Sequence, residues 1–214
     1  LQNGLTQTHQ NNMGAYGGPD IITDGLVLAL DAGSERSYPG TGTTWKDLSG
    51  NGYDFGFGAG LSWNSTGTFS MTAVSSGGAV FSGNITSSTT CTMQFWIKTT
   101  DGQSLFWEPT NTPSSYIGAY KASNKFYNGS STGSPQYYQD LVLYNNIYDN
   151  LLDGEWHMVE FKAVNLSTFG YHEFNNYGSY QFGNGEIANI MIYDRNLTAA
   201  ESQQNYNAQK NRFI

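Results

Sequence analysis

The stretch CTMQFWIK, from Cys91 to Lys98, decides the fold class of this chain. Its side chains fall on two faces, one with Cys91, Met93, Phe95 and Ile97, and the other with Thr92, Gln94, Trp96 and Lys98. A period of two is the spacing at which side chains alternate across a β-strand. The stretch is therefore predicted to be a half-buried antiparallel strand with its apolar face toward a core.

Similar short segments are found on both sides of this strand. Gly, Asn, Ser and Pro clusters separate them at the close spacing that is typical of a sandwich or barrel. The expected strands are Leu26–Asp31, Thr68–Val74, Leu105–Glu108, Leu141–Tyr148, Glu155–Val164 and Glu186–Tyr193. No helical pattern intervenes, so the sequence predicts an all-β fold.

One helix is expected near the C-terminus. Thr198 and Glu201 have the spacing of a capping box, in which the two side chains bind amides at the start of a helix. The helix should run through Gln204 toward Gln209. The predicted organisation is an extended N-terminal arm at residues 1–24, one domain at 25–196, and a C-terminal helix and tail at 197–214 packed on that domain.

Composition excludes several functions. The 214 residues contain 9 Lys and Arg against 17 Asp and Glu, a net charge of −8, so no basic surface for nucleic acid is expected. The sequence contains no run of about 18 apolar residues, so membrane insertion is not expected. The single cysteine, Cys91, rules out an intrachain disulfide and a cysteine-based zinc cage, and its apolar strand predicts a buried thiol.

Two longer segments resemble a known family. LVLALDAGSERSYPGTGTTWKDLSGNGYDF at Leu26–Phe55 and GEIANIMIYDRNLTAAESQQNYNAQKNRF at Gly185–Phe213 resemble the laminin-G-like branch of the concanavalin A-like lectin/glucanase superfamily. FWIKT at Phe95–Thr99 and DGEWHMVEF at Asp153–Phe161 are similar to the central strands of that family. The resemblance implies a two-sheet antiparallel jelly-roll sandwich that is closed by the terminal helix.

The N-terminal part of this signature also suggests a setting. The segment DGLVLALDAG…SYPGTGTTWKDLSGNG, at Asp24–Gly52, is similar to domains in structural proteins of tailed bacteriophages. This implies a non-enzymatic component of the virion that contacts other virion proteins. The polar arm, residues 1–24, is either a disordered tail or a strap that pairs with a sheet edge on a neighbour. A homo-oligomer or a capsid-docked subunit is therefore expected.

Turn residues in the signature are most simply explained by folding. Asn51–Gly52 supplies the positive φ angles of a tight hairpin, and Tyr38–Pro39–Gly40 reads as a second turn. A fold shared by lectins, glucanases and capsid spikes does not by itself name a function.

Catalytic motifs do not fit well. The glucanases of the superfamily carry three alternating acids on one strand, but Ala188 and Ile190 follow Glu186 at those positions, so Glu186 is expected to be an exposed strand-end charge. Gly129–Gly133 matches the G-x-S-x-G sequence pattern of a nucleophile elbow. The elbow also requires a helix after the pattern, but Ser134–Pro135 follows here, so a loop is expected instead. A glycoside hydrolase is thus disfavoured, and the chain is expected not to be an enzyme.

No cofactor is expected from the motifs. Asp149, Asp153, Gly154 and Glu160 match part of a calcium loop, but Leu151 occupies a ligand position and a strand follows. A Ca2+ site at a sheet edge, as in some laminin-G-like and pentraxin domains, is compatible with the many Asp and Asn residues, with ligands unassigned. His157 lies inside a predicted strand and is expected to be a hydrogen-bonded structural imidazole.

Aromatic side chains supply the remaining functional lead. Trp96 lies opposite the core face, where its ring either stacks on a sugar or, as we favour, packs beneath a loop or strand. The segment Tyr116–Tyr138 is expected to be a loop with the composition of a binding surface for a glycan or a protein. The alternative function is therefore an adhesin that binds a host glycan, with candidate carbohydrate-binding residues Trp96, Tyr120, Tyr127, Tyr137 and Tyr138.

Overall fold

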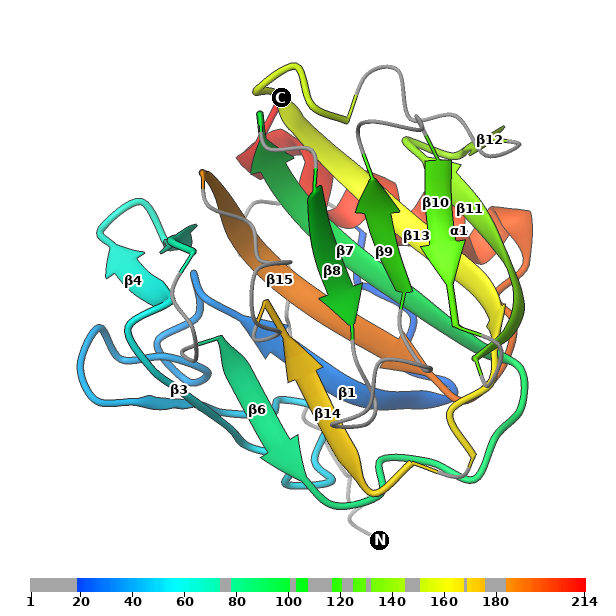
Figure 1. The fold of residues 1–214 in the computed structure, drawn as a ribbon, viewed down its shortest axis with the longest axis horizontal. Coiled ribbons are helices and arrows are strands. Elements are labelled where there is room, and N and C mark those ends of the chain that lie inside the picture. The colour runs from blue at the N-terminus through cyan, green and yellow to red at the C-terminus, as the bar shows by residue number, and fades with distance from the viewer. Residues whose placement is uncertain are drawn as a thin grey trace, which may run out of the picture.

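The computed structural model describes residues 19–73, 78–100, 103–107, 117–120, 125–129, 132–144, 151–167, 169–175 and 184–214. This part of the chain is an antiparallel β-sandwich with one α-helix on its outside (Figure 1). The predicted all-β jelly roll is confirmed. Within the same residues, no helix is long and apolar enough to cross a membrane.

One layer is an 8-stranded sheet in the order β12-β11-β13-β7-β15-β5-β4, with β1 also paired to β15. Its three central strands are nine residues long and bury most of their side chains. The strands are β1 (Leu26–Asp31), β4 (Leu61–Asn64), β5 (Thr68–Met71), β7 (Cys91–Thr99), β11 (Gly133–Gln139), β12 (Val142–Tyr144), β13 (Trp156–Val164) and β15 (Gly185–Tyr193).

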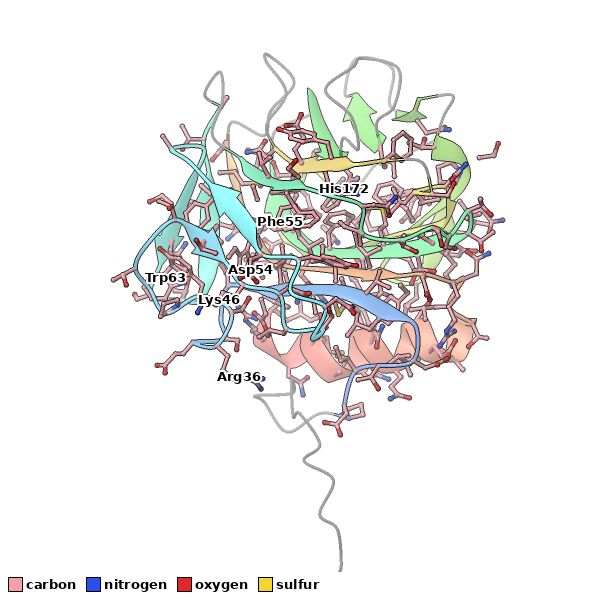
Figure 2. All side chains as sticks on the ribbon, turned by 90° about the horizontal axis from the view of Figure 1, so that it is seen from below. Arg36, Lys46, Asp54, Phe55, Trp63 and His172 are labelled. Carbon is pink, nitrogen blue, oxygen red and sulfur yellow. The ribbon has the colours of Figure 1, made fainter. Side chains whose placement is uncertain are left out.

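The second layer consists of two smaller sheets that lie over one face of the large sheet (Figures 1 and 2). Their orders are β10-β9-β8 and β14-β6-β3-β2. The strands are β2 (Thr44–Trp45), β3 (Phe55–Phe57), β6 (Ala79–Ser82), β8 (Gln103–Trp107), β9 (Ile117–Tyr120), β10 (Lys125–Asn128) and β14 (Tyr171–Phe174).

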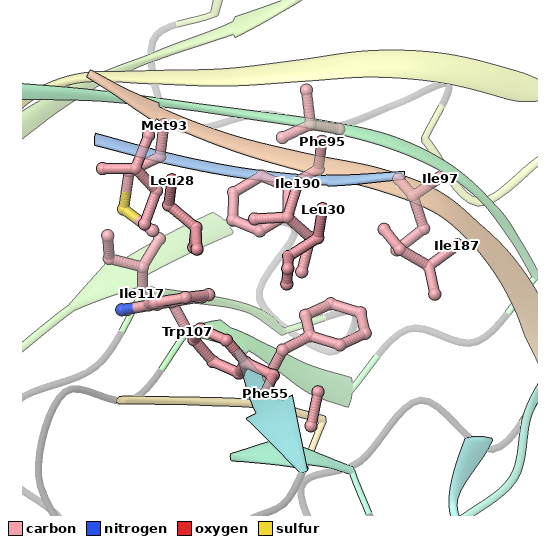
Figure 3. Close-up of a cluster of buried hydrophobic side chains, with 14 of the residues drawn as sticks. Leu28, Leu30, Phe55, Met93, Phe95, Ile97, Trp107, Ile117, Ile187 and Ile190 are labelled. Atoms are coloured by element: carbon pink, nitrogen blue, oxygen red, sulfur yellow. The ribbon is translucent and has the colours of Figure 1, made fainter. Parts of the chain in front are cut away.

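The core lies between these two layers (Figure 3). Cys91, Met93, Phe95 and Ile97 are all fully buried there, as the alternation on this strand predicts. Trp107 and Phe55 meet them from the second layer. Burial raises the pKa of the Cys91 thiol to about 11, so the buried thiol that the sequence predicts is confirmed.

The helix α1 (Ala199–Gln209) covers the other face of the large sheet, and a short 3-10 helix, η3 (Lys210–Arg212), follows it (Figure 2). The capping box is confirmed, because the Thr198 hydroxyl accepts from the Glu201 amide and the Glu201 carboxylate accepts from the Thr198 amide. The Arg195 guanidinium and the Thr198 amide hold the pKa of Glu201 at about 2.

Residues 20–22, from the segment that was expected to be an arm, pack against the folded body. Ile21 is buried against Met191 and Tyr193. The Ile22 amide donates to the Asn205 side chain at 2.8 Å, and the Tyr193 hydroxyl donates to the Ile22 carbonyl at 3.0 Å. The sequence missed this packing because two apolar residues give no periodicity. Residues 1–18 lie outside the described residues.

The signature loop between β2 and β3 is held by one carboxylate. Asp47 accepts hydrogen bonds from the amides of Ala29, Ser49 and Tyr53. Gly50 and Gly52 adopt positive φ angles of 96° and 78°. The expected tight hairpin was wrong, since nine residues separate the two strands, but the interpretation of these residues as folding residues is confirmed.

Candidate functional site

Trp96 is not available as a sugar platform in this structure. Its side chain is fully buried, and its ring stacks on Phe213 and Tyr206 with centroid distances of 4.5 and 5.5 Å. Both partners come from the C-terminal helix and tail, which cover this face of the sheet. The favoured alternative, that Trp96 packs beneath another element, is the one observed.

The four tyrosines do not form one loop surface. Part of the expected loop consists of the strands β9, β10 and β11 instead. Tyr137 is buried against Phe161 and donates to Gln139, and burial raises its pKa well above the ordinary value. Tyr138 points to the opposite face, where its ring lies 5.1 Å from the Lys162 ammonium. Tyr120 lies on β9 and Tyr127 on β10, and their side chains lie outside the described residues.

A pocket of about 280 Å³ lies where β5, β7 and β15 end or begin together. Ligand pockets usually measure about 300–1,000 Å³, so this one suits a small ligand or one ring of a larger one. Figure 1 shows the end of β7 beside the start of β15. The polar residues that line the pocket are Ser70, Lys98, Thr99, Thr100, Asn184 and Glu186.

Strand register explains why these side chains meet. Glu186 is paired with Lys98 on one neighbouring strand and with Ser70 on the other, so the three side chains share a face. The row continues to Trp156 on β13, which is paired with Lys98 on β7. Trp156 is half-buried because its ring packs on Phe213 at 4.8 Å. An aromatic ring therefore stands at one end of a polar row.

Glu186 is anchored away from Lys98. Its Oε2 accepts a hydrogen bond from the Thr68 hydroxyl at 2.5 Å and lies 3.3 Å from the Asn64 amide nitrogen. Within the described residues, Oε1 has no hydrogen-bond partner, and no carboxylate lies within ion-pair distance of Lys98. Glu186 is thus half-buried in a pocket, whereas the sequence suggested an exposed charge.

The wall of the pocket is held by short contacts. The Thr99 hydroxyl donates to the Asn184 carbonyl at 2.6 Å, and the Asn184 amide donates to the Thr100 hydroxyl at 2.9 Å. Gly185 approaches β7 so closely that a Cβ atom would lie 2.3 Å from the Lys98 carbonyl oxygen. A glycine is therefore required where β15 begins.

The described residues provide neither a pair of catalytic carboxylates in the pocket nor a cluster of metal ligands. Glu186 is the only acid in the pocket lining there, and retaining hydrolysis needs two carboxyl groups about 5 Å apart. No group of three or more His, Cys, Asp and Glu in this part of the chain could hold a metal ion. Asp149, from the partial calcium loop, lies outside the described residues.

The two described histidines have structural environments. His157 contacts Asp140 and Asp153, so the expected hydrogen-bonded imidazole is confirmed. His172 lies in the core, where its Nδ1 accepts from the Trp107 indole at 3.3 Å. Burial lowers the pKa of His172 to about 4, so its ring is neutral at physiological pH.

Among the polar residues of this pocket, Glu186 alone was weighed from the sequence for a functional role. A signal for Lys98 was present, because the alternation placed Lys98 on the same face as Trp96 and nearest the end of the strand. Trp156 carried the same two-residue period on β13. Asn184 and Ser70 gave no signal, because polar residues of these types are frequent throughout the chain.

Comparisons with known proteins give the fold. No protein-family model matches the sequence, and a search of curated proteins finds no match. Trypanosoma rangeli sialidase in complex with the inhibitor DANA is similar with a TM-score of 0.60 and 14% identity, over 94% of this chain and 37% of the sialidase.

Two toxin domains are similar as well. The botulinum neurotoxin serotype D binding domain has a TM-score of 0.58 and the binding domain of Paraclostridial Mosquitocidal Protein 1 has 0.57. Each is 13% identical, over 88% of this chain and 53% of the other. The chain thus spans about a third of the sialidase and about half of each toxin chain. These likenesses show that it has a lectin-like β-sandwich fold.

Proposed function

We propose that this protein is a carbohydrate-binding module without catalytic activity, and that the pocket formed by β5, β7 and β15 binds a saccharide. One observation carries the proposal: a partly exposed indole, Trp156, stands in the same cross-strand row as Lys98, Glu186 and Ser70. Sugar rings present an apolar face for stacking and a rim of hydroxyls for hydrogen bonds. An aromatic ring beside convergent polar groups matches both needs.

The polar groups offer both kinds of hydrogen bond. Glu186 Oε1 accepts from a sugar hydroxyl, while Lys98 and Asn184 donate to oxygens of the ring or its substituents. Because Thr68 and Asn64 already fix the Glu186 side chain, little side-chain entropy is lost on binding. A sialidase that was solved with sialic acid is similar to this chain over 35% of its own length, which supports a saccharide ligand by association alone.

The test is a glycan array followed by calorimetry on each hit. Glu186→Gln and Asn184→Ala should each weaken binding by roughly fivefold to tenfold, since each removes one hydrogen-bonding partner. Glu155→Gln, an exposed site outside the pocket, makes the same charge change and should leave the affinity unchanged. Unchanged affinity in both pocket variants would reject this site, and no binding to any glycan at millimolar concentration would reject the function.

We also propose a setting for this activity. The resemblance of residues 24–52 to structural proteins of tailed phages favours a virion component, either on the head or in a tail fibre, which presents many copies of the module. Multivalent display turns weak saccharide contacts into stable attachment. Mass spectrometry of purified particles tests this setting, and absence of the protein from those particles would contradict it while leaving the saccharide site open.

A further inference from the structure

We infer that the pocket selects a saccharide that carries a carboxylate, a uronic-acid type of sugar, and that Lys98 is the counter-ion of that carboxylate. The inference rests on the proposed function and adds the chemical class of the ligand. Its starting point is a pair of opposite charges that face each other across two strands without forming an ion pair.

Oppositely charged residues in direct cross-strand register have Cβ atoms about 4.5–5.5 Å apart, which is close enough for the two charges to attract each other. Here the Thr68 hydroxyl and the Asn64 amide hold the Glu186 carboxylate on the β4–β5 side of the pocket. Lys98 lies on the β7 side, and in the described part of the chain no acidic oxygen lies within 4.0 Å of its ammonium. The pocket therefore has a cationic end and an anionic end.

Two other cations that are at least partly buried are paired with acids inside the fold. Lys162 contacts Glu160 at 3.3 Å, and Arg212 contacts Asp31 at 2.6 Å. Lys98 differs from them because it lines a hollow together with residues that carry hydroxyl and amide groups, and no acid in the described part of the chain pairs with it. An ammonium in that position can meet an anion supplied from outside the chain.

The two ends impose an orientation on the ligand. A carboxylate at the Lys98 end gains a charge-assisted hydrogen bond, which is about twice as strong as a neutral one. The same carboxylate at the other end would be repelled by Glu186, whose Oε1 instead accepts from hydroxyls. A sugar acid has both groups on one ring, so a single ring matches both ends of the pocket.

The experiment compares three ligands that differ at one group: methyl glucuronide, its uncharged amide, and methyl glucoside. Calorimetry on the wild-type protein at low salt should give roughly tenfold tighter binding of the uronate than of the other two. The preference should decline as salt is added. Lys98→Met keeps the length of the side chain and should abolish the preference, while Lys46→Met, at an exposed site away from the pocket, should preserve it.

The outcomes separate this inference from the proposed function. Equal binding of all three ligands, with no effect of Lys98→Met, would overturn the inference and leave a neutral saccharide site. No binding of any saccharide would overturn both.

Discussion

The Glu160 carboxylate lies 2.7 Å from the Ser202 hydroxyl, which joins β13 to α1 inside a buried interface. The same carboxylate accepts from the Gln94 amide at 2.6 Å and contacts the Lys162 ammonium at 3.3 Å. Lys162 also donates to the Leu197 carbonyl. A buried charge is tolerated when its hydrogen bonds are satisfied, so these donors fix the position of the helix on the sheet.

Ser202→Ala tests this relationship. The change removes one donor from a buried carboxylate, and we expect a loss of about 1–3 kcal/mol in the free energy of unfolding. Urea denaturation measures it. Gln203→Ala, at the next and exposed position of the same helix, should change stability by less than about 0.5 kcal/mol. Equal effects of the two changes would show that the buried contact is unimportant.

Phe213, next to the C-terminus, packs on two tryptophans: its ring is stacked on Trp96 and tilted against Trp156. Its ring lies 4.5 Å from that of Trp96 and 4.8 Å from that of Trp156. Phe213→Ala should cost about 2–4 kcal/mol, somewhat less than a fully buried phenylalanine because Phe213 is partly exposed. Exposure of Trp96 to water should also shift the tryptophan emission to longer wavelength. Ile214→Ala, at an exposed neighbour, is the control and should change neither property.

How far the sequence predicts this fold depends on how local the signal is. The strands at Leu26–Asp31 and Cys91–Thr99 are predictable because each contains its own short apolar or alternating stretch, which can be recognised without the rest of the chain. For the strands at Ile117–Tyr120 and Lys125–Asn128 the sequence predicts a loop instead, because Gly, Ser and Asn surround them. Pairing with neighbouring strands stabilises such segments, and pairing is not a local property.

The candidate site was less predictable for a related reason. The alternation placed Trp96 and Lys98 on one face, but it did not show that α1 and Phe213 would cover Trp96 and leave Lys98 half-exposed. That choice depends on where the C-terminal segment docks. Glu186, Ser70 and Lys98 are far apart in the sequence, and only strand register brings them together.

The docking of residues 20–22 gives a prediction about truncation. Removing residues 1–24 deletes Ile21, which is 6% exposed, and the hydrogen bonds of Ile22 to Asn205 and Tyr193. Burial of one isoleucine is worth about 1.5–3 kcal/mol, so the melting temperature should fall by roughly 5–10 °C. Calorimetry should find the truncation of residues 1–19 close to wild type. An equal melting temperature for both truncations would contradict the packing of Ile21.

The imidazole of His157 lies between two carboxylates. Its Nδ1 is 2.6 Å from Asp140, its Nε2 is 3.1 Å from Asp153, and the Gln139 amide lies 3.1 Å from Nδ1. Burial lowers the pKa of His157, but the hydrogen bonds and charges of the two carboxylates outweigh it, so the pKa is raised above its ordinary value. The pKa of Asp153 is lowered, because the amide of Glu155 and the His157 ring outweigh its desolvation.

The raised pKa of His157 predicts how stability depends on pH. Below about pH 6.5, the pKa of an unfolded histidine, both states are protonated and the stabilising contribution of the imidazolium is complete. Above that pH the unfolded state loses its proton first, so the contribution declines and is lost once the pH passes the folded-state pKa. His157→Gln keeps a hydrogen-bonding side chain without the charge. The difference in unfolding free energy between wild type and His157→Gln, measured in urea from pH 5.5 to pH 9, should therefore shrink as the pH rises. A difference that stays constant or grows over that range would show that the two carboxylates do not hold a charged imidazole.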